Sequence, residues 1–273
     1  MTSVSEERAV RPVRRGEALV LWAGLLVAFS PTLLDLARHM AENPWARYAV
    51  LFPFLFARCA LNDPEQLPER RDGTLWLGLG MGVELFGIFA GATRIGRMGL
   101  ALAAIGLCRR FALASWPSLV LLALAVPLPD AVLRWTSPGA ENALLSAASD
   151  LLGPLGVTIE INGTQAFYGT QALALGRSDS GAPLAVLLIG LSWYHSLMLG
   201  TPARAAALRA AAAPLLAIPV QIAAIALALL TLPLGAGAAG RLALTHLPWM
   251  AVAAVGLVTT ELRYRRGGAP HER

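Results

Sequence analysis

Eight long apolar runs divide this chain, and they limit it to folds that can bury or embed so many hydrophobic segments. Arg pairs, Pro or Gly separate the runs. They cover residues 18–34, 46–61, 74–92, 95–108, 114–129, 181–200, 210–234 and 242–260. Only 14% of the residues are charged and mean hydropathy is +0.59, whereas soluble domains carry about 25% charge. Because a membrane-spanning helix needs about 20 apolar residues, the sequence predicts an all-α polytopic membrane protein with about eight transmembrane helices.

The distribution of arginine predicts the orientation of these helices. If the N-terminus is cytoplasmic, the inner segments hold about twice as many Arg residues as the outer ones, which fits the positive-inside rule. The inner set is Arg8, Arg11, Arg14, Arg15, Arg70, Arg71, Arg109, Arg110, Arg204, Arg209, Arg263, Arg265, Arg266 and Arg273. We therefore expect a multi-pass protein of the inner (plasma) membrane, forming a single domain over 1–273, with cytoplasmic tails at 1–17 and 261–273.

One long connection, residues 130–180, falls between the fifth and sixth predicted spans and is expected outside the membrane. Its first half, 140–155, has apolar residues at helical spacing, with Glu141 and Asp150 off that face. This pattern predicts an amphipathic helix lying in the membrane interface. In its second half, apolar and polar residues alternate over 157–161, the pair Asn162 and Gly163 follows, and 166–168 resumes the apolar pattern. Such a pattern predicts a small external hairpin.

Several classes of function are disfavoured by what the sequence lacks. It has no H-E-x-x-H, no phosphate-binding loop and no G-x-S-x-G pattern, which argues against the common metalloproteases, nucleotide-binding proteins and serine hydrolases. The four widely spaced His residues make no metal signature, and Cys59 and Cys108 imply no disulfide framework. The cations are dispersed between apolar runs, so the lipid bilayer is the expected partner and nucleic acid is not. No cofactor or metal is expected.

Two polar residues lie in the middle of predicted spans. Glu84 is in the third span and His195 is in the sixth. An ionisable group at such a position is costly unless it is neutral, paired or facing a cavity, so both are functional candidates. The structural alternatives are a protonated Glu84 bonded to a neighbouring helix and a packing role for His195.

A longer pattern of residues resembles the exosortase/archaeosortase family. Leu124-Ala125-Val126-Pro127-Leu128-Pro129-Asp130 is followed by the predicted amphipathic helix, by the hairpin, and by Ser178-Asp179-Ser180-Gly181 at the start of a span. The family has the same order of features, with a phrase close to I-P-L-P-D and a strand-like segment ending in A-C-S-G. The resemblance covers most of the chain.

The resemblance implies a function in protein sorting. Members of the family act as cysteine peptidases and transpeptidases on a C-terminal tag, which consists of a short Pro-containing motif, a transmembrane helix and a basic tail. Their proposed catalytic set is the Cys of A-C-S-G, an Arg from N-x-x-R in the next span, and a His near the outer start of the last span. Here Asp179 replaces the Cys, and Ile225 and Ala228 replace the Asn and the Arg, so only His246 matches.

Three functions remain open after this comparison of motifs. The first is a catalytically silent relative that recognises the sorting tag of exported proteins at the outer face. The second is an active peptidase that uses Ser180 as nucleophile, or Asp179 and His246 as an acid/base pair. The third is a transporter or an assembly factor for exported polysaccharide. In the first two, Gly181 lines the site and Arg177 is a candidate to bind an acidic residue of the tag, unless Arg177 is only a solvated loop charge. The sequence gives no oligomeric state.

Overall fold

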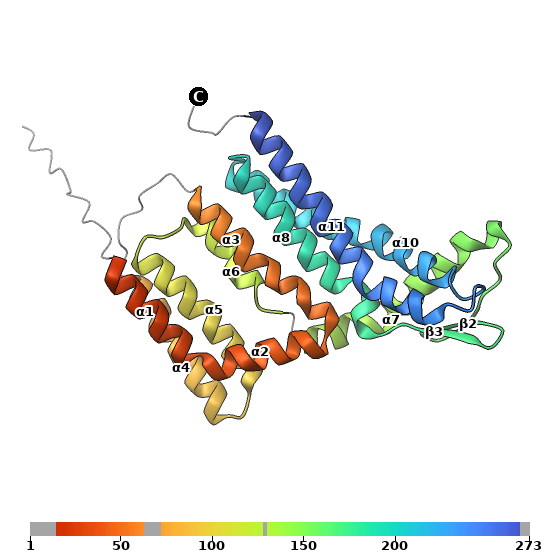
Figure 1. Cartoon of the computed structure of the whole chain (residues 1–273), viewed down its shortest axis with the longest axis horizontal. Helices are drawn as coiled ribbons and strands as arrows, with labels where there is room; N and C mark the ends of the chain where they lie inside the picture. Colours follow the sequence, from red (N-terminus) through yellow and green to blue (C-terminus); the bar gives the residue numbers. More distant parts are fainter. Residues whose placement is uncertain (1–14, 63–71, 128–129, 268–273) are drawn as a thin grey trace, which may run out of the picture. The chain divides into compact units, whose positions relative to one another are not determined.

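The computed structural model describes residues 15–62, 72–127 and 130–267 and is mostly helical (Figure 1). The first part of the chain forms α1 (Arg15–Ala28), α2 (Ser30–Glu42), η1 (Pro44–Val50), α3 (Leu51–Leu61), α4 (Asp72–Phe89), α5 (Thr93–Arg110) and α6 (Trp116–Leu124). The second part forms α7 (Asp130–Leu152), η2 (Gly153–Leu155), β1 (Glu160–Asn162), β2 (Gln165–Tyr168), β3 (Gln171–Ala174), η3 (Arg177–Ser180), α8 (Ala182–Met198), α9 (Ala203–Ala212), η4 (Ala213–Leu216), α10 (Ala217–Leu229) and α11 (Gly237–Gly267).

Two compact units group these elements. Unit 1 takes in the described residues of Met1–Leu36 and Ala60–Ala123, and unit 2 takes in those of Ala37–Cys59 and Leu124–Arg273. The single domain over 1–273 stays a prediction.

The candidate membrane spans are fewer than the predicted runs. Among the described residues, two helices are long and apolar enough to cross a membrane: Ala203–Leu229, which joins α9, η4 and α10, and Gly237–Arg266 within α11. A third span is obtained if α1 and α2 count as one, but the chain bends by 65° between them. Pro31 explains the bend, because its nitrogen has no hydrogen to donate to the preceding turn. The count of about eight spans is thus not confirmed.

Unit 1 is built on an unusually close helical pair. Gly73, Gly80 and Gly87 recur every seven residues along α4 and lie against the backbone of α5. A Cβ at Gly80 would lie 2.4 Å from Ala103 N and 2.7 Å from Gly99 O, distances that only glycine permits. A small apolar cluster formed by Leu25, Phe29, Ala103, Leu107 and Phe111 joins α1 and α5.

Unit 2 contains an antiparallel sheet in the order β1-β2-β3. Ile161 pairs with Ala166 across the first turn, and Ala166 pairs with Leu173 across the second. The hairpin predicted from the Asn162–Gly163 signal is present as β1 and β2, and Gly163 has a φ of +60°. The third strand was not predicted, because Gln171–Ala174 has no β-branched residue to indicate a strand.

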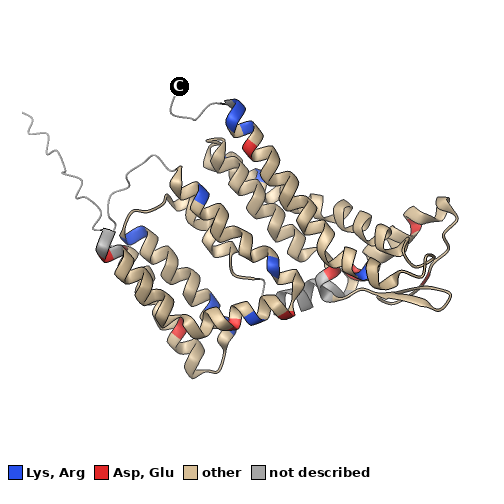
Figure 2. Ribbon diagram, viewed as in Figure 1, with Lys and Arg blue, Asp and Glu red and all other residues tan. Residues whose placement is uncertain are grey.

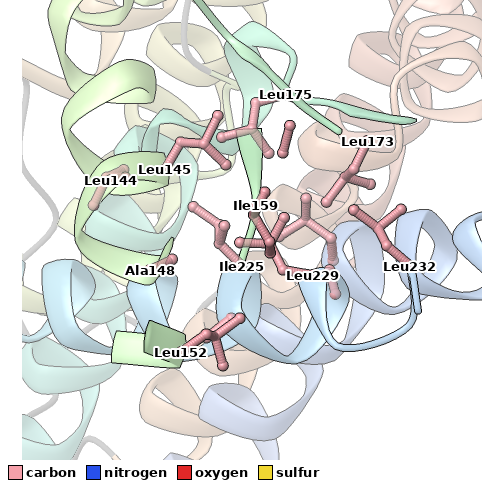
Figure 3. Packing of buried hydrophobic residues seen from close by; sticks show 14 residues of the cluster. Leu144, Leu145, Ala148, Leu152, Ile159, Leu173, Leu175, Ile225, Leu229 and Leu232 are labelled. Carbon is pink, nitrogen blue, oxygen red and sulfur yellow. The ribbon is translucent and has the colours of Figure 1, made fainter. Parts of the chain in front are cut away.

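The apolar face of α7 packs inside unit 2. Leu144, Leu145, Ala148 and Leu152 are buried together with residues of the sheet and α10 (Figure 3). The prediction that Glu141 lies off this face was wrong, since its exposed fraction is only 6%. Leu151 and Leu155, apolar residues of the same 140–155 stretch, are instead 58% and 68% exposed. Helical periodicity identifies an apolar stripe but does not specify whether lipid or protein covers it.

Candidate functional site

Asp179 is held firmly at the start of the segment that leads into α8. Its carboxylate Oδ2 accepts a hydrogen bond of 2.7 Å from the backbone N–H of Gly176, and its own N–H donates to Gly176 O at 2.7 Å. This reciprocal arrangement closes the short helix η3. The residue is 4% exposed. The side chain of Asp179 therefore has a structural role in shaping this turn.

A guanidinium group accompanies the buried carboxylate. Arg241, in the first turns of α11, lies with Nη1 3.5 Å from Asp179 Oδ2. The same nitrogen donates a hydrogen bond to the carbonyl oxygen of Ala174 at the end of β3. The Arg241 side chain is 46% exposed, whereas that of Asp179 is 6% exposed. No motif in the sequence singles out Arg241, although it precedes His246 by little more than one helical turn.

A cavity opens beside this ion pair. About 400 Å³ of its space is free of protein atoms, open solvent included. Its surface is mainly aromatic and apolar, with three polar side chains. The lining residues are Trp45, Tyr48, Asp179, Pro183, Leu184, Gln221, Leu244, Thr245, Pro248 and Trp249. Trp249 Nε1 is buried and has no hydrogen-bond partner among the described residues. The cavity thus offers flat apolar surfaces, with the carboxylate of Asp179 in its lining.

Gln221 lines the cavity, and Gly181, which is absent from the lining, lies close to the Gln221 side chain. Gly181 has a φ of +82°, which favours glycine, and it links η3 to α8. A Cβ at this position would lie 3.8 Å from the Gln221 side chain. One and two turns further along α10, Ile225 and Ala228 are fully buried in the apolar cluster of unit 2. Both are therefore core positions in this chain.

Ser180 lies next to Asp179 but lacks the contacts of an activated nucleophile. Its Oγ is buried and makes no hydrogen bond to any described residue. A serine nucleophile needs a base within hydrogen-bond reach. This geometry gives Ser180 no such base.

The structure describes the side chain of His246, but of Arg177 it describes only the backbone. His246 is half-buried in α11, and it is absent from the described residues that line the cavity, although Thr245 and Trp249 on the same helix are present. Helical geometry explains this, because a step of one residue turns the side chain by about 100°. The backbone of Arg177 lies in η3, and its side chain is outside the described part of the chain.

The other polar candidates lie away from the cavity lining. His195 Nδ1 is 2.8 Å from Thr260 Oγ1, which fixes the ring between α8 and α11. Cys59 and Cys108 are both buried. Within 15–62, 72–127 and 130–267, no three His, Cys, Asp or Glu residues lie close enough together to hold a metal ion.

Replacing Ser180 by Ala is expected to change the free energy of unfolding by less than about 1 kcal/mol, towards higher stability, because it removes an unpaired buried hydroxyl. Thr260→Val is the contrasting variant, since it removes a hydroxyl that is bonded to His195 and is expected to cost about 1 kcal/mol. Unfolding of the purified protein in detergent measures both changes. A larger loss for Ser180→Ala than for Thr260→Val would contradict the contacts described for Ser180.

Comparison of the chain with family models, with curated proteins and with solved structures finds no match.

Proposed function

We propose that the protein recognises the C-terminal sorting tag of exported proteins at the outer face of the inner membrane, and that it does so without the usual cysteine chemistry. The proposal rests on the resemblance of its motifs to exosortases. One observation supports it most directly: the residue in place of the family cysteine is an ion-paired carboxylate at the wall of an aromatic cavity.

The surfaces of the cavity are suited to a peptide that contains proline. Trp45, Tyr48 and Trp249 offer flat faces on which an apolar ring can pack. The Gln221 side chain, which lines the cavity, can both donate and accept hydrogen bonds. Arg241 is exposed enough to contact an acidic group of the tag.

The charges in the site support binding over catalysis. A carboxylate that accepts a backbone N–H and lies beside a guanidinium is a weak nucleophile towards an amide. The described contacts give Ser180 no base, and His246 is outside the cavity lining. A catalytically silent relative is therefore the form of the proposal that we favour.

Eight spans with both termini in the cytoplasm are part of the same proposal. Each of the eight apolar runs contains at least one helix. In α11, no Asp, Glu, Lys or Arg occurs from Leu242 to Thr260, and Arg263, Arg265 and Arg266 follow (Figure 2). By the positive-inside rule, this order favours a cytoplasmic position for the end of α11. The segment 130–180, with the cavity beside it, is then external.

Co-expression with a tagged protein from the same genome tests the proposal. We expect the intact tagged protein to co-purify with the wild type, and we expect Trp249→Ala to weaken this capture by roughly 30-fold, the effect of losing a central aromatic anchor. Trp249→Phe keeps a ring and removes the N–H, so its capture is expected to be intermediate. His246→Ala is the matched control on the same helix, because His246 lies outside the cavity lining.

The outcomes separate the two forms of tag recognition, silent binding and altered chemistry. Capture without cleavage that depends on Trp249 supports a silent tag-binding protein. Cleavage in the wild type that disappears in Ser180→Ala or Asp179→Ala would establish altered chemistry and overturn the silent form. If the tagged proteins of that genome are neither captured nor cleaved, tag recognition is refuted.

A further inference from the structure

Unit 2 carries a cluster of arginines where α3, α8 and α11 end and α9 begins. The last three of them follow one another closely at the end of α11 (Figure 2). The cluster, here called the basic end, consists of Arg58, Arg204, Arg209, Arg263, Arg265 and Arg266. In α3, α8, α9 and α11, all of them within the described part of the chain, Glu261 is the only acidic residue. The basic end therefore has a large excess of positive charge.

Glu261 neutralises only part of this charge. Its Oε1 accepts a hydrogen bond of 2.9 Å from Nε of Arg265, and its Oε2 lies 3.7 Å from Nη2 of Arg58. The Arg58 guanidinium also lies over the ring of Tyr264, 5.5 Å from the ring centre. One carboxylate thus joins α3 to α11 and is shared by two cations. The other members of the cluster form no ion pair with a carboxylate among the described residues: Arg204, Arg209, Arg263 and Arg266.

Arg209 and Arg263 come from different helices but lie near the same side chain. Nδ1 of His195 is 2.8 Å from Thr260 Oγ1, which links the end of α8 to α11. Arg209 of α9 and Arg263 of α11 both lie close enough to His195 to act on its ring electrostatically. Both arginines are exposed, and Nη1 of Arg209 donates to the neutral hydroxyl of Thr201 at 3.3 Å. The fold therefore gathers two exposed cations around one point.

The lengths of the apolar helices place these two cations at the depth of lipid headgroups. The two continuous candidate spans are α9–η4–α10 and α11. No Asp, Glu, Lys or Arg occurs from Ala210 to Leu229 or from Leu242 to Thr260. At about 1.5 Å per residue, each stretch is roughly 30 Å long, which matches the hydrocarbon core of a bilayer. With both helices in the membrane, Arg209 and Arg263 lie at the same boundary, next to the phosphate layer.

Exposed arginines at this depth match the chemistry of an anionic phospholipid. A guanidinium group can donate two parallel hydrogen bonds to a phosphate, and clusters of about four to eight basic residues beside a span typically attract the anionic headgroups of the cytoplasmic leaflet. We propose that the basic end binds the headgroup of an anionic phospholipid, with Arg209 and Arg263 as its main phosphate ligands. This inference rests on the membrane-spanning position of α9–α10 and α11, which is part of the proposed function, and it does not depend on tag recognition.

Native mass spectrometry of the purified full-length protein measures which lipids stay bound. The protein is incubated in detergent micelles with equal amounts of phosphatidylglycerol, which is anionic, and phosphatidylethanolamine, which is zwitterionic. We expect the wild type to retain phosphatidylglycerol preferentially. Arg263→Gln is expected to weaken this retention about five-fold, the fold-change that corresponds to about 1 kcal/mol per basic residue at an anionic surface. Arg263→Lys keeps the charge and is expected to retain most of the preference.

Arg38→Gln is the matched control. Arg38, in α2, is also exposed and does not belong to the basic end, so this variant changes the net charge equally and is expected to leave lipid retention unchanged. A second measurement needs no variant. Raising the salt concentration during the incubation is expected to lower retention of phosphatidylglycerol by the wild type, because salt screens exposed charges.

Two results would overturn the proposal without affecting tag recognition. Equal retention of the two lipids by the wild type is the first, and it would leave the basic end as a surface for an acidic protein segment. An equal loss of retention in Arg38→Gln and Arg263→Gln is the second, because the preference would then follow net charge alone. Failure of the protein to insert into vesicles of the two lipids would instead refute the membrane-spanning position on which both proposals rest.

Discussion

Gly80→Ala is expected to destabilise unit 1 by more than about 3 kcal/mol, at or above the upper end of the range for overpacked cores. The new Cβ would lie 2.4 Å from Ala103 N and 2.7 Å from Gly99 O. Both obstacles are backbone atoms, which cannot rotate away as a side chain can. The two helices must separate along their length, and the expected result is a much lower yield and melting temperature of the purified protein.

Gly78→Ala and Gly82→Ala are matched controls in the same helix. A Cβ at either position would have no atom within 4 Å outside its own helix backbone. Since Ala is favoured over Gly in a helix interior by roughly 0.5–1 kcal/mol, both variants are expected to be neutral or slightly stabilised. Equal melting temperatures for Gly80→Ala and Gly78→Ala would show that α4 and α5 do not approach each other this closely.

Arg241→Met is expected to destabilise unit 2 by about 1–3 kcal/mol, between the values for exposed and fully buried ion pairs. The reason is the asymmetry of the pair. Asp179 is buried, so loss of the guanidinium removes a cation from a carboxylate that water reaches poorly, whereas Arg241 is half-exposed and can be solvated alone. The variant also loses the hydrogen bond to the carbonyl of Ala174.

Asp179→Asn is the complementary variant, and it is expected to cost less than about 1 kcal/mol, because an amide oxygen can still accept the N–H of Gly176. The double variant Asp179→Asn with Arg241→Met is expected to recover part of the stability lost in Arg241→Met alone. Thermal unfolding followed by tryptophan fluorescence measures the cycle. A double variant as unstable as the sum of the single variants would indicate that the two charges do not interact.

The helices and the hairpin, which depend on the order of residues over short stretches of the sequence, were predictable. Apolar runs produce helices wherever the backbone must satisfy its own hydrogen bonds, and an Asn-Gly pair between alternating residues produces a hairpin. The structure contains both. The number of spans did not follow in the same way, because Pro31 bends the first run and the helices α3, α6 and α8 are only 11, 9 and 17 residues long.

The candidate site was predictable only in part. The sequence pointed to Asp179, Ser180 and Gly181 because they are adjacent and open a helix, and these residues do lie together. It could not associate them with Arg241 or Gln221, which come from α11 and α10 and are brought to Asp179 and Gly181 only by packing. His246 matched a motif, but its angular position on α11 leaves it outside the cavity lining.

The sequence by itself determined where helices and turns form, and that the chain has apolar segments of membrane-spanning character. Only the tertiary structure decided which surfaces meet: that the sheet covers the apolar face of α7, that Arg241 neutralises Asp179, and that Gly96 encloses Glu84. The physical reason is that backbone hydrogen bonding and periodicity are local properties. Burial and charge pairing depend instead on residues far apart in the chain, and no local pattern records which of them will be neighbours.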